Sequence, residues 1–323
     1  VSRGLGDVYK RQGVRSQAMK LSFLSADTDG RFLEPRLPFE SIAANFESRF
    51  GKALPKPILH QAHIGESLSL IYSPFYIKDK LYDAIIDKPA SGQAWENFNI
   101  EDFESGRPQW KLRFVSTLCP NCGWDLDGQR DALVGLCKNC NSAWYPLGRK
   151  LKQLKFARIP DAGDNTLYLP FWRIRTEISG IRLQSYADLV RIANIPKAMQ
   201  NGWDEIPFRF WIPAFKVRPR LFLRLASHLT VSQPREELIP ELPSNRIYPS
   251  TLPVKEAIES LPITLSEFMK PRRKMMERFY DILIEAKSFT LIFVPFSEEH
   301  HEFIHHEYQI AINKNVMAHS KNL

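Results

Sequence analysis

All four cysteines of the chain fall within 22 residues, and this constrains the fold more than any other feature of the sequence. They form two Cys-x-x-Cys pairs, Cys119 with Cys122 and Cys137 with Cys140, separated by 14 residues. A disulfide framework would spread its cysteines along the chain, whereas this spacing is typical of a metal site in a reducing compartment. The pattern predicts one zinc ion bound by all four thiolates.

Each pair is expected to form a knuckle, a tight turn that points two sulfurs and nearby N–H groups at one ion. The residue after the second cysteine often needs a positive φ, which Gly adopts freely and Asn tolerates. Gly123 and Asn141 occupy these two positions. Asp127-Gly128 predicts a tight turn between the knuckles. The residues expected to form strands after that turn are Leu133, Val134, Leu136, Trp144 and Tyr145. Together these features predict a zinc ribbon over residues 115–148.

A shell of four thiolates leaves no position for water or substrate, so the predicted zinc is structural and not catalytic. The competing interpretation is a redox pair of the thioredoxin kind, which needs one Cys-x-x-Cys at the start of a helix. This chain has two such pairs, each followed by a turn residue. The sequence therefore favours the zinc site.

Four segments share one pattern: an aromatic residue, any residue, a proline, then apolar or aromatic residues. They are Tyr72–Tyr76, Tyr168–Trp172, Trp211–Phe215 and Phe293–Phe296. Strand-like alternation follows the second segment, because Ile174, Thr176 and Ile178 alternate with charged residues. Proline cannot donate a hydrogen bond to a neighbouring strand, so such segments predict bent strands in a curved sheet or partial barrel.

From the ribbon through Tyr168-Leu169-Pro170-Phe171-Trp172, roughly residues 116–175, the chain resembles bacterial zinc-ribbon proteins of uncharacterised function. The resemblance implies a ribbon joined to a β-rich body. It supplies no reaction, substrate or partner.

Helical spacing predicts short helices over residues 41–50, before Pro196 and from Pro271 to about Lys287. The prolines between residues 232 and 253 predict an extended surface connection. The expected fold class is α+β: a mostly antiparallel, proline-bent β-sheet body with two or three helices and an inserted four-Cys zinc ribbon. Its expected parts are a non-native leader (1–18), the N-terminal part of the body (19–114), the ribbon (115–148) and the C-terminal part with helices (149–323).

The formal net charge of +8 is a weak argument for a nucleic-acid partner. Residues 1–12 (VSRGLGDVYKRQ) resemble a translated adapter sequence, and Met19 is the expected native start. Without residues 1–18 the net charge falls to +5. No apolar run approaches the roughly 18 residues of a membrane helix, and no secretory signal is recognisable, so we expect a cytoplasmic protein.

His301-Glu302-Phe303-Ile304-His305 matches the His-Glu-x-x-His pattern of zinc metalloproteases, in which two histidines one helical turn apart bind the metal. The position of the third histidine in metzincins is Ala311 here, and the flanking alternation predicts a hairpin instead of a helix. A solvated turn is therefore the favoured interpretation of the cluster from His300 to His306. His60 and His63 are isolated and are expected to have structural roles.

Two groups of cations remain as candidate anion-binding faces, although an ordinary solvated surface explains them as well. They are Lys270, Arg272, Arg273 and Lys274, and Lys216, Arg218, Arg220 and Arg224. The favoured function is a non-catalytic zinc-ribbon adaptor that binds a protein partner in a cytoplasmic assembly. The first alternative is nucleic-acid binding by the ribbon and these basic faces. The second is a metal-dependent hydrolase at His301, Glu302 and His305.

Overall fold

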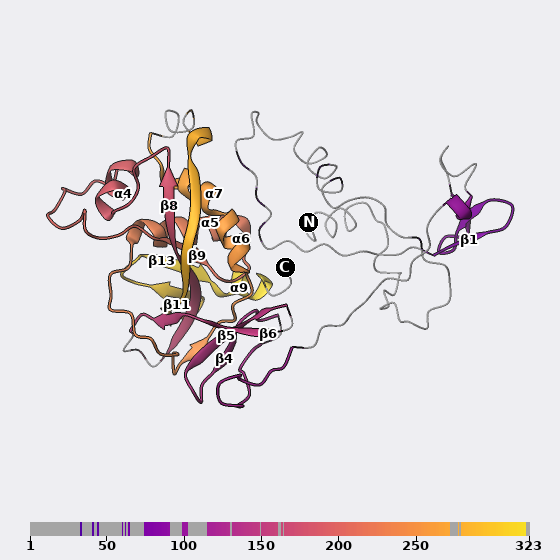
Figure 1. Ribbon diagram of the computed structural model, residues 1–323, viewed down its shortest axis with the longest axis horizontal. Helices are drawn as coiled ribbons and strands as arrows, with labels where there is room; N and C mark the ends of the chain where they lie inside the picture. Colours follow the sequence, from indigo (N-terminus) through magenta and orange to yellow (C-terminus); the bar gives the residue numbers. More distant parts are fainter. Residues whose placement is uncertain are drawn as a thin grey trace. The chain divides into compact units, whose positions relative to one another are not determined.

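The structure is a computed structural model (Figure 1). Besides single positions before residue 74, it describes residues 74–90, 99–102, 115–129, 131–148, 150–160, 163, 165–271, 277 and 279–320. The expected leader, residues 1–18, lies outside the described residues, as does most of the helix expected over residues 41–50. Ser41 and Ala44 are described and are helical. Within the described residues, no helix combines the length and apolar character that a bilayer span requires.

The chain divides into two compact units. The first comprises residues 1–56 and 67–112, and its described part is a small antiparallel sheet of β1 (Phe75–Ile77), β2 (Leu81–Asp83) and β3 (Lys88–Pro89), followed by the 3-10 turn η2 (Ile100–Asp102). The stacked rings of Tyr76 and Tyr82 join β1 to β2. The second unit comprises residues 57–66 and 113–323 and holds the cysteines. The domain boundaries expected from the sequence stay a prediction.

Two long antiparallel strands, β8 (Thr166–Ser179) and β11 (Leu283–Glu298), run side by side through the second unit (Figure 1). The sheet order is β10-β8-β11-β12-β13, with β9 also beside β8 and β7 also beside β11. Only the pairs β10–β8 and β7–β11 are parallel among the described strands. The bounds of the shorter strands are β7 (Phe156–Arg158), β9 (Phe210–Pro213), β10 (Arg246–Ile247), β12 (Glu302–His305) and β13 (Ile310–Asn313).

The helices of this unit are short, and most pack on the sheet through apolar residues. Helices α5, α6 and α7 lie together on one side of β8 and β11 (Figure 1). Leu225 and Leu229 of α5 and Leu261 and Leu265 of α7 are fully buried. The bounds are α4 (Tyr186–Ile192), α5 (Pro219–Ser232), α6 (Val254–Glu259), α7 (Leu261–Phe268) and α9 (Lys314–Ser320), with the 3-10 turn η3 (Phe279–Asp281) before β11. These elements confirm the predicted α+β class with a mostly antiparallel body.

Three of the four aromatic-x-Pro segments belong to this one sheet. Pro170 lies within β8, Pro213 ends β9 and Pro295 lies within β11. The first segment is different, because its described part leads into β1 of the other unit. The prediction of one sheet from four such strands is therefore wrong for the first segment.

Pro170 and Pro295 are placed where the sheet needs no N–H from them. Beside β8, the neighbouring strand changes from β9 to β10 at Pro170, whose carbonyl accepts a hydrogen bond from Ala214 N (2.9 Å). Beside β11, the neighbour changes from β7 to β12 around Pro295. A proline can therefore lie inside each long strand without breaking a hydrogen-bonded pair.

Two other local predictions are corrected. The helix expected from Pro271 to Lys287 is wrong at its C-terminal end, because residues 283–287 belong to β11 and residues 283–286 pair with Thr176–Ser179 of β8. Long-range pairing prevails there over the helical spacing of the apolar residues. The segment 232–253 is not only a surface connection, since Ser250 and Leu252 are buried and the carbonyl of Leu252 accepts a hydrogen bond from Trp172 Nε1 (3.0 Å).

Candidate metal centre

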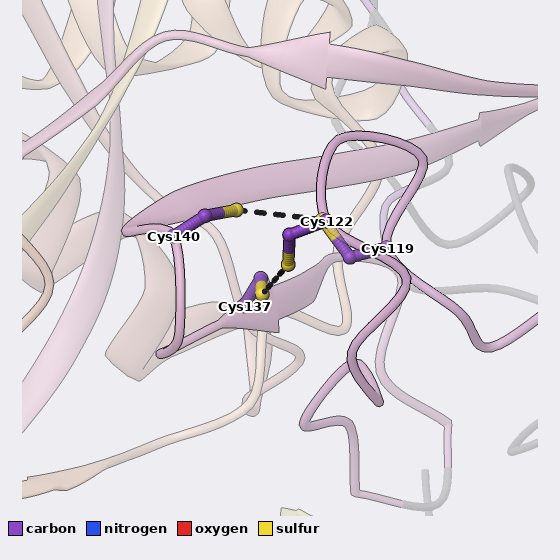
Figure 2. A group of neighbouring side chains, drawn as sticks. All are labelled: Cys119, Cys122, Cys137 and Cys140. Atoms are coloured by element: carbon purple, nitrogen blue, oxygen red, sulfur yellow. Dashed lines mark hydrogen bonds between the residues drawn. The ribbon is translucent and has the colours of Figure 1, made fainter.

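The four cysteines meet at one end of a small antiparallel sheet of β4 (Gly135–Cys137), β5 (Ser142–Leu147) and β6 (Lys150–Leu154). Cys137 ends β4, and Cys140 lies in the turn that leads into β5. Cys119 and Cys122 come from the loop that precedes this sheet, and Figure 2 shows all four sulfurs directed toward one point.

The sulfur positions fit a single tetrahedral ion. All four Sγ atoms lie within 4.8 Å of one another, and the two closest pairs, Cys119–Cys140 and Cys122–Cys137, are 3.5 and 3.4 Å apart (Figure 2). A disulfide would require about 2 Å between sulfurs. A tetrahedron with metal–sulfur bonds of about 2.3 Å spaces its sulfurs by about 3.8 Å. The four cysteines are thus a group that could hold a metal ion.

The knuckle backbone takes the predicted form. Gly123 and Asn141 have φ values of 74° and 51°, as expected for the residues that follow the two pairs. The N–H of Gly123 donates to the carbonyl of Cys119 (2.8 Å) and closes the first turn. Backbone N–H groups also point at sulfur: that of Trp124 reaches Cys122, and that of Cys140 reaches Cys137. These donors would stabilise thiolates, the form that binds a metal.

A second layer of hydrogen bonds supports Cys119 and Cys140, and sequence reasoning missed its central residue, Ser142. Trp144 Nε1 donates to Ser142 Oγ (2.8 Å), which leaves the serine proton free to reach the sulfurs of Cys140 (3.0 Å) and Cys119 (3.6 Å). Ser142 is 2% exposed, so water does not replace it. A serine two residues after the last cysteine, on a strand with an inward tryptophan, is the signal that could have identified it.

The hydrogen bonds lower the pKa of Cys119. Burial by itself raises the pKa of its thiol. Hydrogen bonds from Ser142 and from the N–H groups of Asn121 and Cys122 outweigh burial, and the pKa falls to about 6. At neutral pH Cys119 is therefore largely a thiolate, the form that binds a metal, whereas at Cys137 burial outweighs the backbone hydrogen bond and raises the pKa to about 12.

The ribbon is joined to the body by three hydrogen bonds and by shared apolar residues. Asn141 Nδ2 donates to the carbonyl of Pro240 (3.1 Å), and its Oδ1 accepts from the N–H of Leu242 (2.7 Å). The N–H of Leu133 donates to the carbonyl of Ser250 (2.7 Å). Val134, Leu136, Ala143 and Leu154 join the main core, whereas Cys119, Cys137 and Trp144 form a separate small cluster. The four-cysteine site and the body thus share one small sheet.

One detail of the ribbon differs from expectation. Asp127 exchanges two backbone hydrogen bonds with Leu136 (2.7 and 2.9 Å), so residues 128–135 form the connection between them. Asp127-Gly128 is therefore not the tight turn predicted from the sequence. The connection is long because Leu133 within it is held by Ser250 of the body. The expected strand through Trp144 and Tyr145 is confirmed as β5.

The other predicted sites do not form comparable groups. Glu302–His305 is strand β12, so the solvated turn expected from His300 to His306 is wrong for these residues. Four residues of extended chain span about 13 Å against about 6 Å on a helix. His301 and His305 consequently lack the metalloprotease geometry. His305 is buried against Phe296 and Tyr308. In the described part of the chain, the four cysteines are the sole group of three or more metal-type ligands.

The structure describes only some residues of the two basic groups. Arg272, Arg273 and Lys274 lie outside the described residues, while Lys270 is exposed. Arg218, Arg220 and Arg224 are exposed at the start of α5, and Arg224 donates to the carbonyl of Ala311 (2.8 Å). The ring of His60 lies 3.3 Å from the carbonyl of Glu259, and His63 is not described.

No protein-family model, curated protein or solved structure matches the chain. The resemblance to bacterial zinc-ribbon proteins over residues 116–175 therefore stays a prediction.

Proposed function

We propose that the protein is a non-catalytic adaptor of a cytoplasmic assembly, in which a structural zinc ribbon presents a binding surface to a protein partner. Four thiolates at the observed sulfur separations suit zinc, which prefers a tetrahedral shell of nitrogen and sulfur ligands. With Cys119, Cys122, Cys137 and Cys140 all engaged, the shell is closed. The ion would fix the loop conformation and would not touch a substrate.

The observation that carries the adaptor proposal is an exposed apolar pair on the first knuckle. Trp124 is 62% exposed and Leu118 is 50% exposed. The segment holding both is rigid, because Cys119 N donates to the carbonyl of Trp124 (2.7 Å) and Leu118 pairs with Asp125. A large aromatic side chain on a fixed platform is typical of the residues that dominate protein–protein binding energy.

Local charge favours a protein over a nucleic acid at this surface. Asp125 and Asp127 follow Trp124 in the chain, and both are exposed. Lys138 neutralises only Asp127, with Nζ 2.9 Å from its carboxylate. A phosphate backbone would be repelled by Asp125, whereas a protein surface with basic residues around an apolar pocket would fit.

The metal is tested by elemental analysis of purified protein. We expect one zinc per chain, and we expect Cys119→Ser combined with Cys137→Ser to lose it. Iron in place of zinc, or zinc retained by the double variant, would contradict the assignment.

The partner is tested by placing a photo-crosslinking residue at position 124 and capturing the protein from a nuclease-treated lysate. Position 280 is the matched control, since Tyr280 is also 62% exposed but lies outside the ribbon. We expect one protein to crosslink at 124 and not at 280, and to be lost with Leu118→Ser while zinc content stays at one. Material that crosslinks at 124 only without nuclease would support the nucleic-acid alternative instead. Equal crosslinking at both positions would refute the proposed surface.

A further inference from the structure

Three arginines gather on one face of the large sheet, outside the ribbon. Arg173 and Arg175 alternate along β8 and so share a face. Arg173 is opposite Trp211 of β9 in the strand register. Arg209, just before β9, is two residues from Trp211 and comes next to Arg175. The sheet therefore places three cations side by side.

Among the described residues no ion pair reaches Arg173, Arg175 or Arg209, although Arg175 is attracted by Glu177 and the guanidinium of Arg209 donates to the carbonyl of Phe208 (2.7 Å). Glu177, near Arg175, is held by Lys287 at 2.8 Å. Burial lowers the pKa of Arg173 and of Arg209, and the charges of the other two arginines lower that of Arg209 further. Burying cations that repel one another costs free energy, which an anion bound between them would recover.

A cavity of about 570 Å³ opens beside Arg173. This volume lies in the range of small-molecule sites. Its other lining includes Trp211, Glu205 and the segment from Gln233 to Glu236. The Arg173 guanidinium carbon lies 5.7 Å from the centre of the Trp211 ring.

Two buried polar atoms of the lining residues have no hydrogen-bond partner: Arg173 Nε, a donor, and Glu236 Oε2, an acceptor. The other oxygen of Glu236 accepts from the hydroxyl of Tyr308. An unsatisfied buried donor and an unsatisfied buried acceptor are both costly, and both gain from a suitable ligand. If these side chains turn toward the cavity, they suit a molecule that carries an anionic group for the arginine and a hydroxyl group for the glutamate.

The backbone beneath the arginines is fixed. The side-chain amide of Gln233 bonds to both backbone groups of Arg209, accepting from its N–H at 3.1 Å and donating to its carbonyl. Gln233 is buried. A site held this way is preorganised, so little binding energy is lost in ordering it.

We propose that this cavity binds a small hydroxylated phosphomonoester of about the size of a sugar phosphate, with its phosphate against Arg173 and Arg235, the two arginines of the lining, and a hydroxyl group on Glu236. The planar guanidinium fork matches phosphate oxygens and carries a permanent charge. A doubly charged phosphate suits several cations better than a single carboxylate does. Glu205 and Glu236 in the lining disfavour a polyanionic strand, so a small ligand fits better than nucleic acid.

Calorimetric titration at constant ionic strength tests the proposal with three probes: glucose 6-phosphate, inorganic phosphate and glucose. We expect glucose 6-phosphate to bind more tightly than phosphate, and glucose not to bind. Arg173→Gln should weaken both phosphate-bearing probes at least tenfold. Glu236→Gln should weaken glucose 6-phosphate and leave inorganic phosphate no weaker. Arg220→Gln, an exposed arginine of α5, is the matched control and should change neither.

A melting experiment separates binding from folding. Arg173→Met removes a half-buried unpaired cation, so we expect its melting temperature without anion to be no lower than that of the wild type, while glucose 6-phosphate no longer raises it. The proposal is overturned if the wild type binds no phosphate-bearing probe at millimolar concentration. It is also overturned if Arg173→Gln binds like the wild type, or if a single-stranded oligonucleotide displaces glucose 6-phosphate. None of these variants touches a cysteine, so unchanged zinc content and crosslinking at position 124 would leave the adaptor proposal standing.

Discussion

Two side chains, Thr230 of α5 and Gln233 directly after that helix, form hydrogen bonds with the backbone at the outer edge of β9. A substitution at Thr230 therefore tests how much this edge contributes to stability. Thr230 is fully buried, and its Oγ1 accepts from the N–H of Trp211 (3.0 Å) and donates to the carbonyl of the same residue (3.4 Å). Gln233 does the same for Arg209, two residues earlier. Together they replace a neighbouring strand.

Thr230→Val keeps the shape of the side chain and removes both hydrogen bonds. The substitution leaves the buried N–H of Trp211 without an acceptor, which destabilises the fold by about 1–3 kcal/mol. The carbonyl of Trp211 loses a longer and weaker hydrogen bond, which costs less. We therefore expect a loss of about 2–3 kcal/mol in the free energy of unfolding. Thr230→Ser keeps the hydroxyl and loses one buried methyl group, which costs about 1 kcal/mol.

Urea unfolding followed by circular dichroism measures both variants. Their midpoints should fall in the order wild type, Thr230→Ser, Thr230→Val, with an unchanged slope against urea concentration. If valine is tolerated as well as serine, the hydroxyl does not hold the edge of β9, and the reasoning fails.

Three further predictions concern single side chains. Ser142→Ala should keep one zinc per chain but bind it about 10–100-fold more weakly in a competition with a chelator, because the sulfurs of Cys140 and Cys119 lose their hydrogen-bond donor; unchanged affinity would refute this role. Asp188 is buried at the start of α4, where it accepts hydrogen bonds from Ser185 N (3.2 Å) and Gln184 N (3.0 Å) and contacts Arg182 and Arg191. Asp188→Asn should therefore lower the free energy of unfolding by about 2 kcal/mol, and a loss below about 0.5 kcal/mol would count against this role. The hydrogen bond from Lys314 lowers the pKa of Glu298, and the charge of Arg246 adds to it against the opposing effect of burial. The ionised carboxylate therefore stabilises the fold fully above the unfolded pKa of 4.5, and this stabilisation is lost as the pH falls through the lower folded pKa. In parallel unfolding curves, Glu298→Gln should lower the free energy of unfolding by about 1 kcal/mol at pH 7 and by progressively less below about pH 4.5. A cost that does not change with pH would exclude the ion pairs of Glu298 as its cause.

The features that the sequence predicted well are those whose physics is local. The two knuckles depend on cysteines three residues apart and on a residue of positive φ directly after each pair, all readable along the chain. Strand β13 was likewise predicted from the alternation of Tyr308, Ile310 and Ile312, whereas the residues of β12 were expected in a turn. Helix α4 was predicted from apolar spacing before Pro196, and it begins with a capping box formed by Ser185 and Asp188.

The features that were missed depend on contacts between distant residues. Residues 283–287 have helical spacing, but pairing with β8 makes them strand. The connection after Asp127 is long because Ser250 binds Leu133 within it, which no local pattern indicates. Ser142 supports two sulfurs only because β5 brings it beneath them. The cavity beside Arg173 likewise depends on the segment near residue 235, which no local pattern places next to β8.

The contrast between the local ribbon and the long-range pairing of β8 with β11 has a consequence for synthesis on the ribosome. The strand pairs of the ribbon lie between Gly135 and Leu154, whereas Ile174 of β8 pairs with Phe289. At about 5–20 residues per second, β11 is made on the order of ten seconds after the last cysteine. If the ribbon binds zinc as proposed, it folds during that time, while β8 is still without its main partner. We therefore expect zinc supply during translation, and not only after it, to determine how much chain reaches the native state.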